Sequence, residues 1–171
     1  PNIILTFDDG TLGWLSPTYP FSVAPANSAN IGNTNIFGNI FRIPFHCKVD
    51  ALDAIDSPAS GTADFALELY ATPLGTPVLM ESVSFDANVI GSTGQRHYTA
   101  NLLTEYTLAA NTDYAVGVKQ VANNVQVVQR DVNAANHFKA WGPGAECYAA
   151  TSTAAATFAS INSGKRRYEC Y

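Results

Sequence analysis

Charged side chains are scarce in this sequence. Asp, Glu, Lys and Arg make up 13% of the 171 residues, against roughly 25% in a typical globular domain. Together with 47% hydrophobic residues, this low charge excludes an intrinsically disordered chain, which would show the opposite bias. The formal net charge of −5 argues against nucleic-acid binding, because phosphate contacts need clustered Lys and Arg. The one basic cluster, residues 165–167, is interpreted as the exposed start of a last strand.

Cysteine is equally scarce. Cys47, Cys147 and Cys170 are odd in number, and their spacing does not resemble a metal-binding knuckle. These features argue against a disulfide-stapled scaffold and a structural zinc module. Two interpretations stay open: a disulfide between Cys147 and Cys170, or three reduced and largely buried thiols. The second is favoured, because free Cys is among the most buried residue types.

Long apolar runs are missing as well. No segment approaches the roughly 20 residues that span a bilayer, and no signal peptide is visible at the start of the sequence. The chain begins with Pro1 instead of Met and ends inside a predicted strand. We therefore expect a single domain over residues 1–171, taken from a processed chain or from a longer one.

Strand-forming residues dominate what is present. The clearest pattern is Asp64–Tyr70, where Phe65, Leu67 and Leu69 alternate with a second set that includes Glu68. This period of two predicts a strand with one buried face. Further strands are predicted at residues 2–7, 40–44, 47–55, 77–85, 95–103, 115–121, 125–132, 146–153 and 166–171.

Turn residues separate these segments about every 8–12 positions, which is typical of a sandwich or barrel. Asn123-Asn124 predicts a hairpin between the strands on either side of it. Residues 16–34 are interpreted as a long ordered loop, and residues 100–110 and 149–159 are expected to contain at most a turn or two of helix. The expected fold is all-β: an antiparallel β-sandwich of jelly-roll type with about nine or ten strands and little helix.

Leu5–Gly10 is the most conspicuous motif, and it resembles the first motif of polysaccharide deacetylases. In those enzymes one Asp acts as a base and the other binds a metal that also needs two closely spaced His. Here His46, His97 and His137 are isolated and far apart in the sequence, so three zinc ligands are not available. We interpret the motif as a strand end followed by an Asp-Asp-Gly turn.

The same segment, extended to Trp14, is similar to the opening of many carbohydrate-binding sandwiches. Acidic residues in that position sometimes hold a structural calcium in such domains. Ca²⁺ takes six to eight oxygen ligands, so Asp8 and Asp9 alone are weak metal candidates. No metal or other cofactor is expected, with structural calcium left open.

Sequence motifs of catalysis are missing too. The sequence has neither a Gly-x-Ser-x-Gly elbow nor a phosphate-binding Gly-x-x-x-x-Gly-Lys. His46 and Cys47 are adjacent on a predicted strand and point to opposite faces, so they do not form a dyad. We expect no enzyme activity and interpret the following acidic residues as solvated, outward-facing positions: Glu68, Glu81, Asp86, Glu105 and Glu146.

Aromatic residues are the better candidates for ligand binding. Trp14 and Trp141 are the only tryptophans, and Trp141 lies in a loop-like Gly-Pro-Gly context. Exposed aromatic rings can stack on sugar rings, so Trp14, Trp141 and Tyr148 are the candidate binding residues. The alternative interpretation is that both Trp close the ends of the sandwich as core residues, since Trp is highly buried on average.

From Gly38 to Tyr171, the sequence resembles a β-sandwich common in bacteriophage virion proteins and in carbohydrate-binding-module-like domains. The resemblance rests on Phe41–Asp50, Phe65–Tyr70 and Leu108–Val118. In the last segment, Tyr114 is expected to lock a turn with its hydroxyl while its ring fills the edge of the core.

The resemblance implies a non-enzymatic structural or accessory protein of the virion, in a tail, baseplate, fibre or head decoration. Such a protein would bind other virion proteins or copies of itself and could touch cell-surface glycans. It would neither bind nucleic acid nor span a membrane. The alternative is an extracellular, secreted carbohydrate-binding module attached to an enzyme or adhesin.

Overall fold

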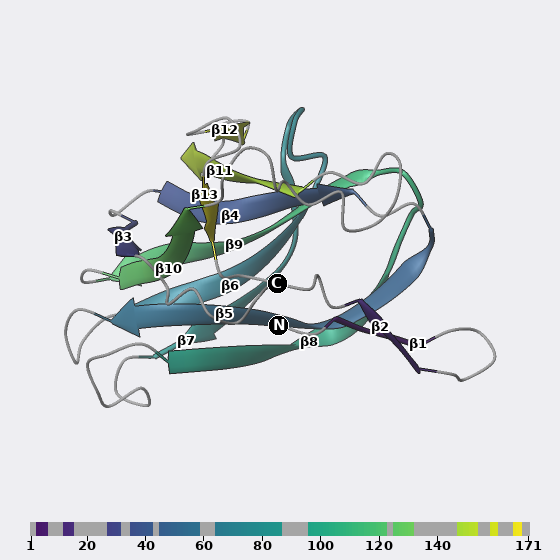
Figure 1. The fold of residues 1–171 in the computed structure, drawn as a ribbon, viewed down its shortest axis with the longest axis horizontal. Helices are drawn as coiled ribbons and strands as arrows, with labels where there is room; N and C mark the ends of the chain where they lie inside the picture. Colours follow the sequence, from purple (N-terminus) through teal and green to yellow (C-terminus); the bar gives the residue numbers. More distant parts are fainter. Residues whose placement is uncertain are drawn as a thin grey trace.

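The computed structural model describes residues 3–6, 12–15, 27–31, 35–42, 45–58, 64–86, 96–122, 125–131, 147–153, 158–160 and 166–168. Within these residues the chain is all-β, with thirteen strands and no helix (Figure 1). Every pairing between the described strands is antiparallel. The predicted all-β, antiparallel class is confirmed for this part of the chain.

The described strands form three sheets. The largest has six strands in the order β12 (Ala159–Ser160), β11 (Cys147–Thr153), β4 (Asn35–Arg42), β9 (Asp113–Ala122), β6 (Asp64–Ala71) and β7 (Val78–Phe85). The second has the order β13 (Arg166–Tyr168), β10 (Val125–Asp131), β5 (Cys47–Pro58) and β8 (Arg96–Leu108), with β3 (Asn27–Asn30) also paired to β10. The third pairs β1 (Ile3–Thr6) with β2 (Leu12–Leu15).

Strand β6 is buried on both faces. Phe65, Leu67 and Leu69 are fully buried on one face, as the alternation predicts. The opposite face, which includes Glu68 and Tyr70, is buried as well. The prediction of a single buried face is therefore wrong for this strand, because Phe158 and side chains of the neighbouring strands cover the outer face locally, around Glu68 and Tyr70.

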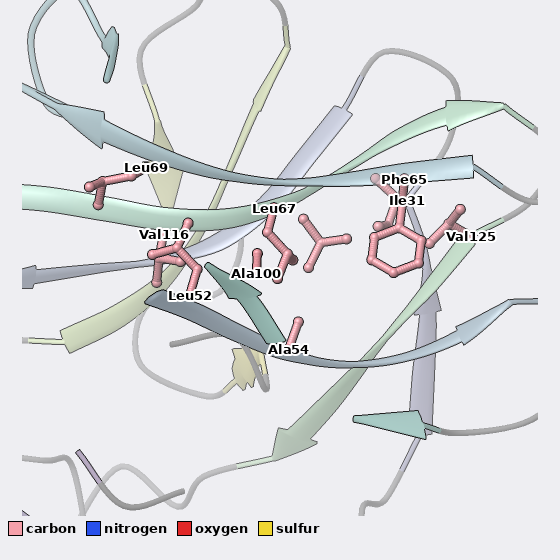
Figure 2. Close-up of a cluster of buried hydrophobic side chains, with 10 residues drawn as sticks. Ile31, Leu52, Ala54, Phe65, Leu67, Leu69, Ala100, Val116 and Val125 are labelled. Atoms are coloured by element: carbon pink, nitrogen blue, oxygen red, sulfur yellow. The ribbon is translucent and has the colours of Figure 1, made fainter. Parts of the chain in front are cut away.

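The main core lies between the two larger sheets. Figure 2 shows Leu67 and Val116 pointing toward Leu52 and Ala54 of the facing sheet. Aromatic rings extend this core, because Phe65 packs against both Phe85 and Tyr98 with ring centroids 4.9 Å apart in each pair. Burying these apolar surfaces stabilises the fold by about 25 cal/mol for each Å² removed from water.

The chain crosses between the sheets after β9. The predicted hairpin would pair β9 with β10, but β9 pairs with β4 and β6, whereas β10 pairs with β3, β5 and β13. The expectation of a β9–β10 pair is therefore wrong, and the turn itself, Asn123-Asn124, lies outside the described residues. Gln120 stabilises the crossing, since its buried side-chain Oε1 accepts a hydrogen bond of 2.9 Å from the backbone N–H of Val125.

Strand β8 runs without interruption to Leu108, so residues 100–110, which were expected to contain at most a turn or two of helix, contain none. Its register with β5 shifts between Val49 and Ala51, which face Tyr106 and Asn101, so the intervening part of β8 forms a wide bulge. The bulge brings β8 to the edge strand β7, where the Leu103 N–H donates to Glu81 Oε1 at 2.6 Å. This hydrogen bond links β8 of the five-stranded sheet to β7 of the six-stranded sheet.

The turn before β9 has the structure that the sequence predicts. The hydroxyl oxygen of Tyr114 accepts a hydrogen bond of 3.0 Å from the backbone N–H of Ala109, and the side chain is buried. Asn111 has a positive φ of 56°, a conformation that Asn tolerates better than most residues. At the start of β9, Asp113 accepts two hydrogen bonds from Arg42, of 2.8 and 2.6 Å.

The expected strand count is too low. The described residues contain β2, β3 and β12 in addition to the strands that the alternation predicts. Strand β3 falls within residues 16–34, which were expected to form a loop, and it has almost no apolar side chains to indicate a strand. Of residues 149–159, the part up to Thr153 is strand, Phe158 has no regular secondary structure, and Ala159 begins β12.

Gly38 gives a test of how closely the central strands approach each other. A Cβ atom at Gly38 would lie 2.8 Å from the Gly117 Cα and closer still to the Val116 carbonyl oxygen, both of which are backbone atoms. We expect Gly38→Ala to lower the free energy of unfolding by at least about 1–3 kcal/mol, because backbone must move to admit the methyl group. Urea unfolding measures the change.

Gly75→Ala is the matched control. A Cβ there would meet only the Thr72 carbonyl oxygen, at 3.8 Å, which is an ordinary contact. We expect a change within about 0.5 kcal/mol, as at most surface positions. Equal effects of the two substitutions would show that β4 and β9 are not packed as described.

Candidate functional site

The structure places two of the predicted binding residues on strands and leaves their side chains undescribed. Trp14 lies in β2, opposite Ile4, and Tyr148 lies in β11, opposite Ile40. These strands belong to different sheets, so the strand register does not bring the two residues together. Trp141, Asp8 and Asp9 lie outside the described residues. A sugar-binding or calcium-binding role for this set stays a prediction.

Of the three cysteines, Cys47 is the one whose side chain is described. Its thiol is free and half-buried, and burial raises its pKa above the ordinary thiol value. Both interpretations of the cysteines, the disulfide and the three reduced thiols, leave Cys47 unpaired. Cys147 lies in β11, opposite Phe41 of β4, and Cys170 lies outside the described residues. A disulfide between Cys147 and Cys170 is therefore untested.

The most unusual polar group in the described part of the chain is the Glu68 carboxylate, which is only 2% exposed. It lies in the middle of β6, on the outer face of the six-stranded sheet. Tyr70 donates its hydroxyl to Oε2 in a short hydrogen bond, and Ser82 donates to Oε1 at 3.1 Å. The Lys119 ammonium lies 3.5 Å from Oε1. The carboxylate thus has three partners, from β6, β7 and β9.

Strand register explains why these groups meet. Glu68 is directly opposite Ser82 of β7 on one side and Gly117 of β9 on the other. Directly opposite residues in an antiparallel pair point to the same face. Lys119 is two residues from Gly117 and therefore points to that face too, next to Glu68. Ile36 packs over Gly117, where a Cβ atom would lie only 2.7 Å from the Ile36 Cγ2.

A small apolar layer adjoins this group. Ile36, Ile40, Ala115, Tyr70 and Phe158 form a buried cluster on the outer side of the sheet. Phe158 packs edge-on against the Tyr70 ring with centroids 5.4 Å apart, and its N–H donates to the Pro73 carbonyl oxygen at 3.0 Å. This layer removes Tyr70 and Glu68 from water.

Burial has a clear electrostatic consequence for Tyr70. Desolvation raises the pKa of its hydroxyl far above the ordinary value, and the hydrogen bond to Glu68 raises it further. The hydroxyl therefore stays protonated as a donor to the carboxylate. A buried carboxylate with two hydrogen-bond donors and a cation close to it is in a stabilising arrangement, and it has little capacity left to bind a substrate.

The sequence analysis interpreted Glu68 as a solvated residue, and that interpretation is wrong. A signal was available, because Ala66 and Tyr70 share its face and neither is a typical solvent-facing residue. His97 has an acidic neighbour that the sequence did not indicate, since its Nε2 lies 3.6 Å from Asp53 Oδ1 on the neighbouring strand. His46 is exposed.

Exposed apolar side chains form a second notable feature. Leu74, Val78 and Leu79 lie in the β6–β7 turn and at the start of the edge strand β7, and about half of each is exposed. Leu103, at the bulge of β8, is 95% exposed. Residues 69–80 contain no charged residue at all. Edge strands usually carry charges or Pro that discourage pairing with another chain; here Pro77 directly precedes β7, and the first charged residue of the strand is Glu81.

Among the described residues, no three His, Cys, Asp or Glu side chains are grouped closely enough to form a metal site. Nor does the described part contain a helix with the length and hydropathy needed to cross a bilayer.

Comparison with known proteins gives no assignment. No protein-family model, curated protein or solved structure matches the chain. Inferences about function therefore depend on the residues and geometry described above.

Tyr70→Phe tests whether the Glu68 group stabilises the fold. Removing the hydroxyl leaves a buried carboxylate with one donor fewer, and hydrogen bonds to charged groups contribute about 1.5–3 kcal/mol. We expect the free energy of unfolding in urea to fall by about that amount.

Tyr114→Phe is the control, because Tyr114 is as buried as Tyr70 but its hydroxyl contacts an uncharged backbone N–H. Its loss should cost only about 0.5–1.5 kcal/mol. A cost for Tyr70→Phe no larger than for Tyr114→Phe would show that the carboxylate does not depend on this donor.

Proposed function

We propose that this protein is a non-enzymatic β-sandwich module that acts by associating with copies of itself and with other proteins, as a structural or accessory part of a phage virion. The observation that carries the proposal is the exposed, uncharged edge at residues 74–79. A chain of net charge −5 resists self-association at most of its surface. Residues 74–79 carry no charged side chain that would repel a second copy at this edge.

The occupant that we propose for this edge is the same edge of a second copy. Antiparallel strand pairing about a twofold axis is self-complementary, since each strand offers the same N–H and C=O groups to its mate. Val78 and Leu79 would then be shielded from water by their counterparts. Contacts of β8 with the Met80 carbonyl oxygen and with Glu81 leave Val78 and Leu79 as the more accessible part of the edge.

Jelly-roll topology is the fold that we propose within the all-β class. Three antiparallel pairs are nested in sequence: β4 with β11, β5 with β10, and β6 with β9. The chain folds back between β7 and β8 at the centre of this nest. Such nesting is the arrangement expected when a long hairpin of strands wraps into two packed sheets.

The absence of catalysis in this proposal is supported by the way the buried polar groups are used. Among the described residues, the buried polar side chains are Asn39, Glu68 and Gln120. The Glu68 oxygens are occupied by the protein's own donors, and Gln120 holds the crossing to β10. Groups used in this way stabilise the fold and do not present a reactive atom to a ligand.

Glycan contact through Trp14, Trp141 and Tyr148 remains part of the proposal. The alternative, a secreted carbohydrate-binding module, depends on the same three residues and on their exposure. The two functions differ in oligomeric state, because a sugar-binding module can act as a monomer, whereas a virion component is built from repeated contacts between copies.

Light scattering over a concentration series tests the association. We expect the wild-type chain to form a stable oligomer and Val78→Lys to shift it toward the monomer, because a charge at the paired edge opposes the contact. Val121→Lys is the matched control: Val121 is 56% exposed against 54% for Val78, but it lies on β9, in the interior of the sheet. A strictly monomeric wild-type chain would contradict the proposal and favour the sugar-binding alternative.

A further inference from the structure

The outer face of the five-stranded sheet carries a carboxylate oxygen without a donor. Asp53 lies on β5 between the core residues Leu52 and Ala54, so its side chain points away from the core. The side chain as a whole is 36% exposed, but its Oδ1 is closed to water and has no hydrogen-bond partner among the described residues. An unsatisfied buried acceptor destabilises a fold, most of all when it is charged. Such an atom is expected to have a donor or a cation beside it.

His97 is the group that faces this oxygen. It lies on β8, where Thr99 is directly opposite Asp53 and His97 directly opposite Ile55. Its Nε2 is 3.6 Å from Asp53 Oδ1, and the imidazole is exposed to solvent on its other side. This separation exceeds that of an N–H···O hydrogen bond, which is about 2.9–3.0 Å.

The separation fits two ligands of one metal ion. Zinc binds His nitrogen at about 2.0–2.1 Å and carboxylate oxygen at about 2.0–2.2 Å, so at a tetrahedral angle the two ligand atoms lie about 3.4 Å apart. Calcium and magnesium prefer oxygen alone, whereas imidazole suits zinc and its neighbours in the transition series. A histidine nitrogen together with a carboxylate oxygen therefore favours zinc and neighbouring transition metals over calcium and magnesium.

The charge distribution along β5 also favours a cation. Residues 49–63 contain no Lys or Arg, so β5 itself supplies no positive side chain beside Asp53. The basic residue in register with this segment is Arg96, opposite Asp56 at the far end of the pairing. Residues 51–56 of β5 pair continuously with β8. The backbones of Asp53 and His97 are therefore held next to each other without an ion.

We propose that Asp53 and His97 form a binding site for a divalent ion of the zinc class on the outer face of the β5–β8 pair. The chain supplies two ligands, so the remaining coordination positions are open to water or to a group from a second molecule. Such a site binds its ion more weakly than a closed four-ligand site. It does not depend on the association proposed for β7.

Calorimetric titration of the metal-free, chelator-treated chain with ZnCl₂ tests the site. We expect one saturable site in the wild type, and a Kd raised about tenfold or more by either Asp53→Asn or His97→Gln, since each removes one of two ligands. His46→Gln is the matched control, because His46 is exposed and is not grouped with Asp53 and His97. It should leave the Kd unchanged.

Three outcomes would overturn the proposal: no saturable binding by the wild type, equal binding by the Asp53 or His97 variant, or an equal loss in His46→Gln. Thermal unfolding separates the site from a simple ion pair. Zinc should raise the Tm of the wild type and of His46→Gln only, while Asp53→Asn should not lower the Tm of the metal-free chain. A lower metal-free Tm would show instead that Asp53 and His97 stabilise each other directly.

Discussion

The burial of β6 on both faces is the constraint on which the rest of this structure depends. Phe65, Leu67 and Leu69 fill the space between the two larger sheets, while Glu68 and Tyr70 are covered on the outer side. A strand buried on both faces must satisfy every polar group within the protein. The partner strands β7 and β9 meet this need, because their backbones pair with β6 and Ser82 and Lys119 reach the Glu68 carboxylate.

This constraint decides where function can reside. A carboxylate surrounded by its own donors stabilises the fold, so the most polar interior position of the described chain is unavailable to a ligand. Within the described residues, two surface features stand out: the uncharged beginning of the edge strand β7, and the outer face of β5 and β8 where Asp53 meets His97. Both are formed by backbone register, and neither needs a deep pocket. The association and the ion binding that we propose are assigned to these two surfaces.

The sequence predicted the elements that depend on local pattern. Alternation located β5, β6, β7, β9 and β10, and the Leu108–Tyr114 segment predicted the turn that the Tyr114 hydroxyl closes. Contacts between distant segments were not predictable in this way. The crossing after β9, the bulge of β8 and the burial of Glu68 each depend on a partner far along the chain, and a period of two does not say whether a second layer covers a strand. The Asp53–His97 pair was missed for the same reason, since 44 residues separate two side chains that β5–β8 pairing makes neighbours.

Amide hydrogen exchange of the native chain tests the dependence on β6 most directly. If β6 is the interior strand of the structure, the amides of Leu67, Glu68 and Leu69 should exchange among the slowest in the chain, at rates set by global unfolding. In the dissociated monomer, the amides of Val78 and Leu79 on the edge strand should exchange faster, through local opening. Exchange of the three β6 amides as fast as that of Val78 and Leu79 would contradict the account, because a strand buried on both faces does not open by itself.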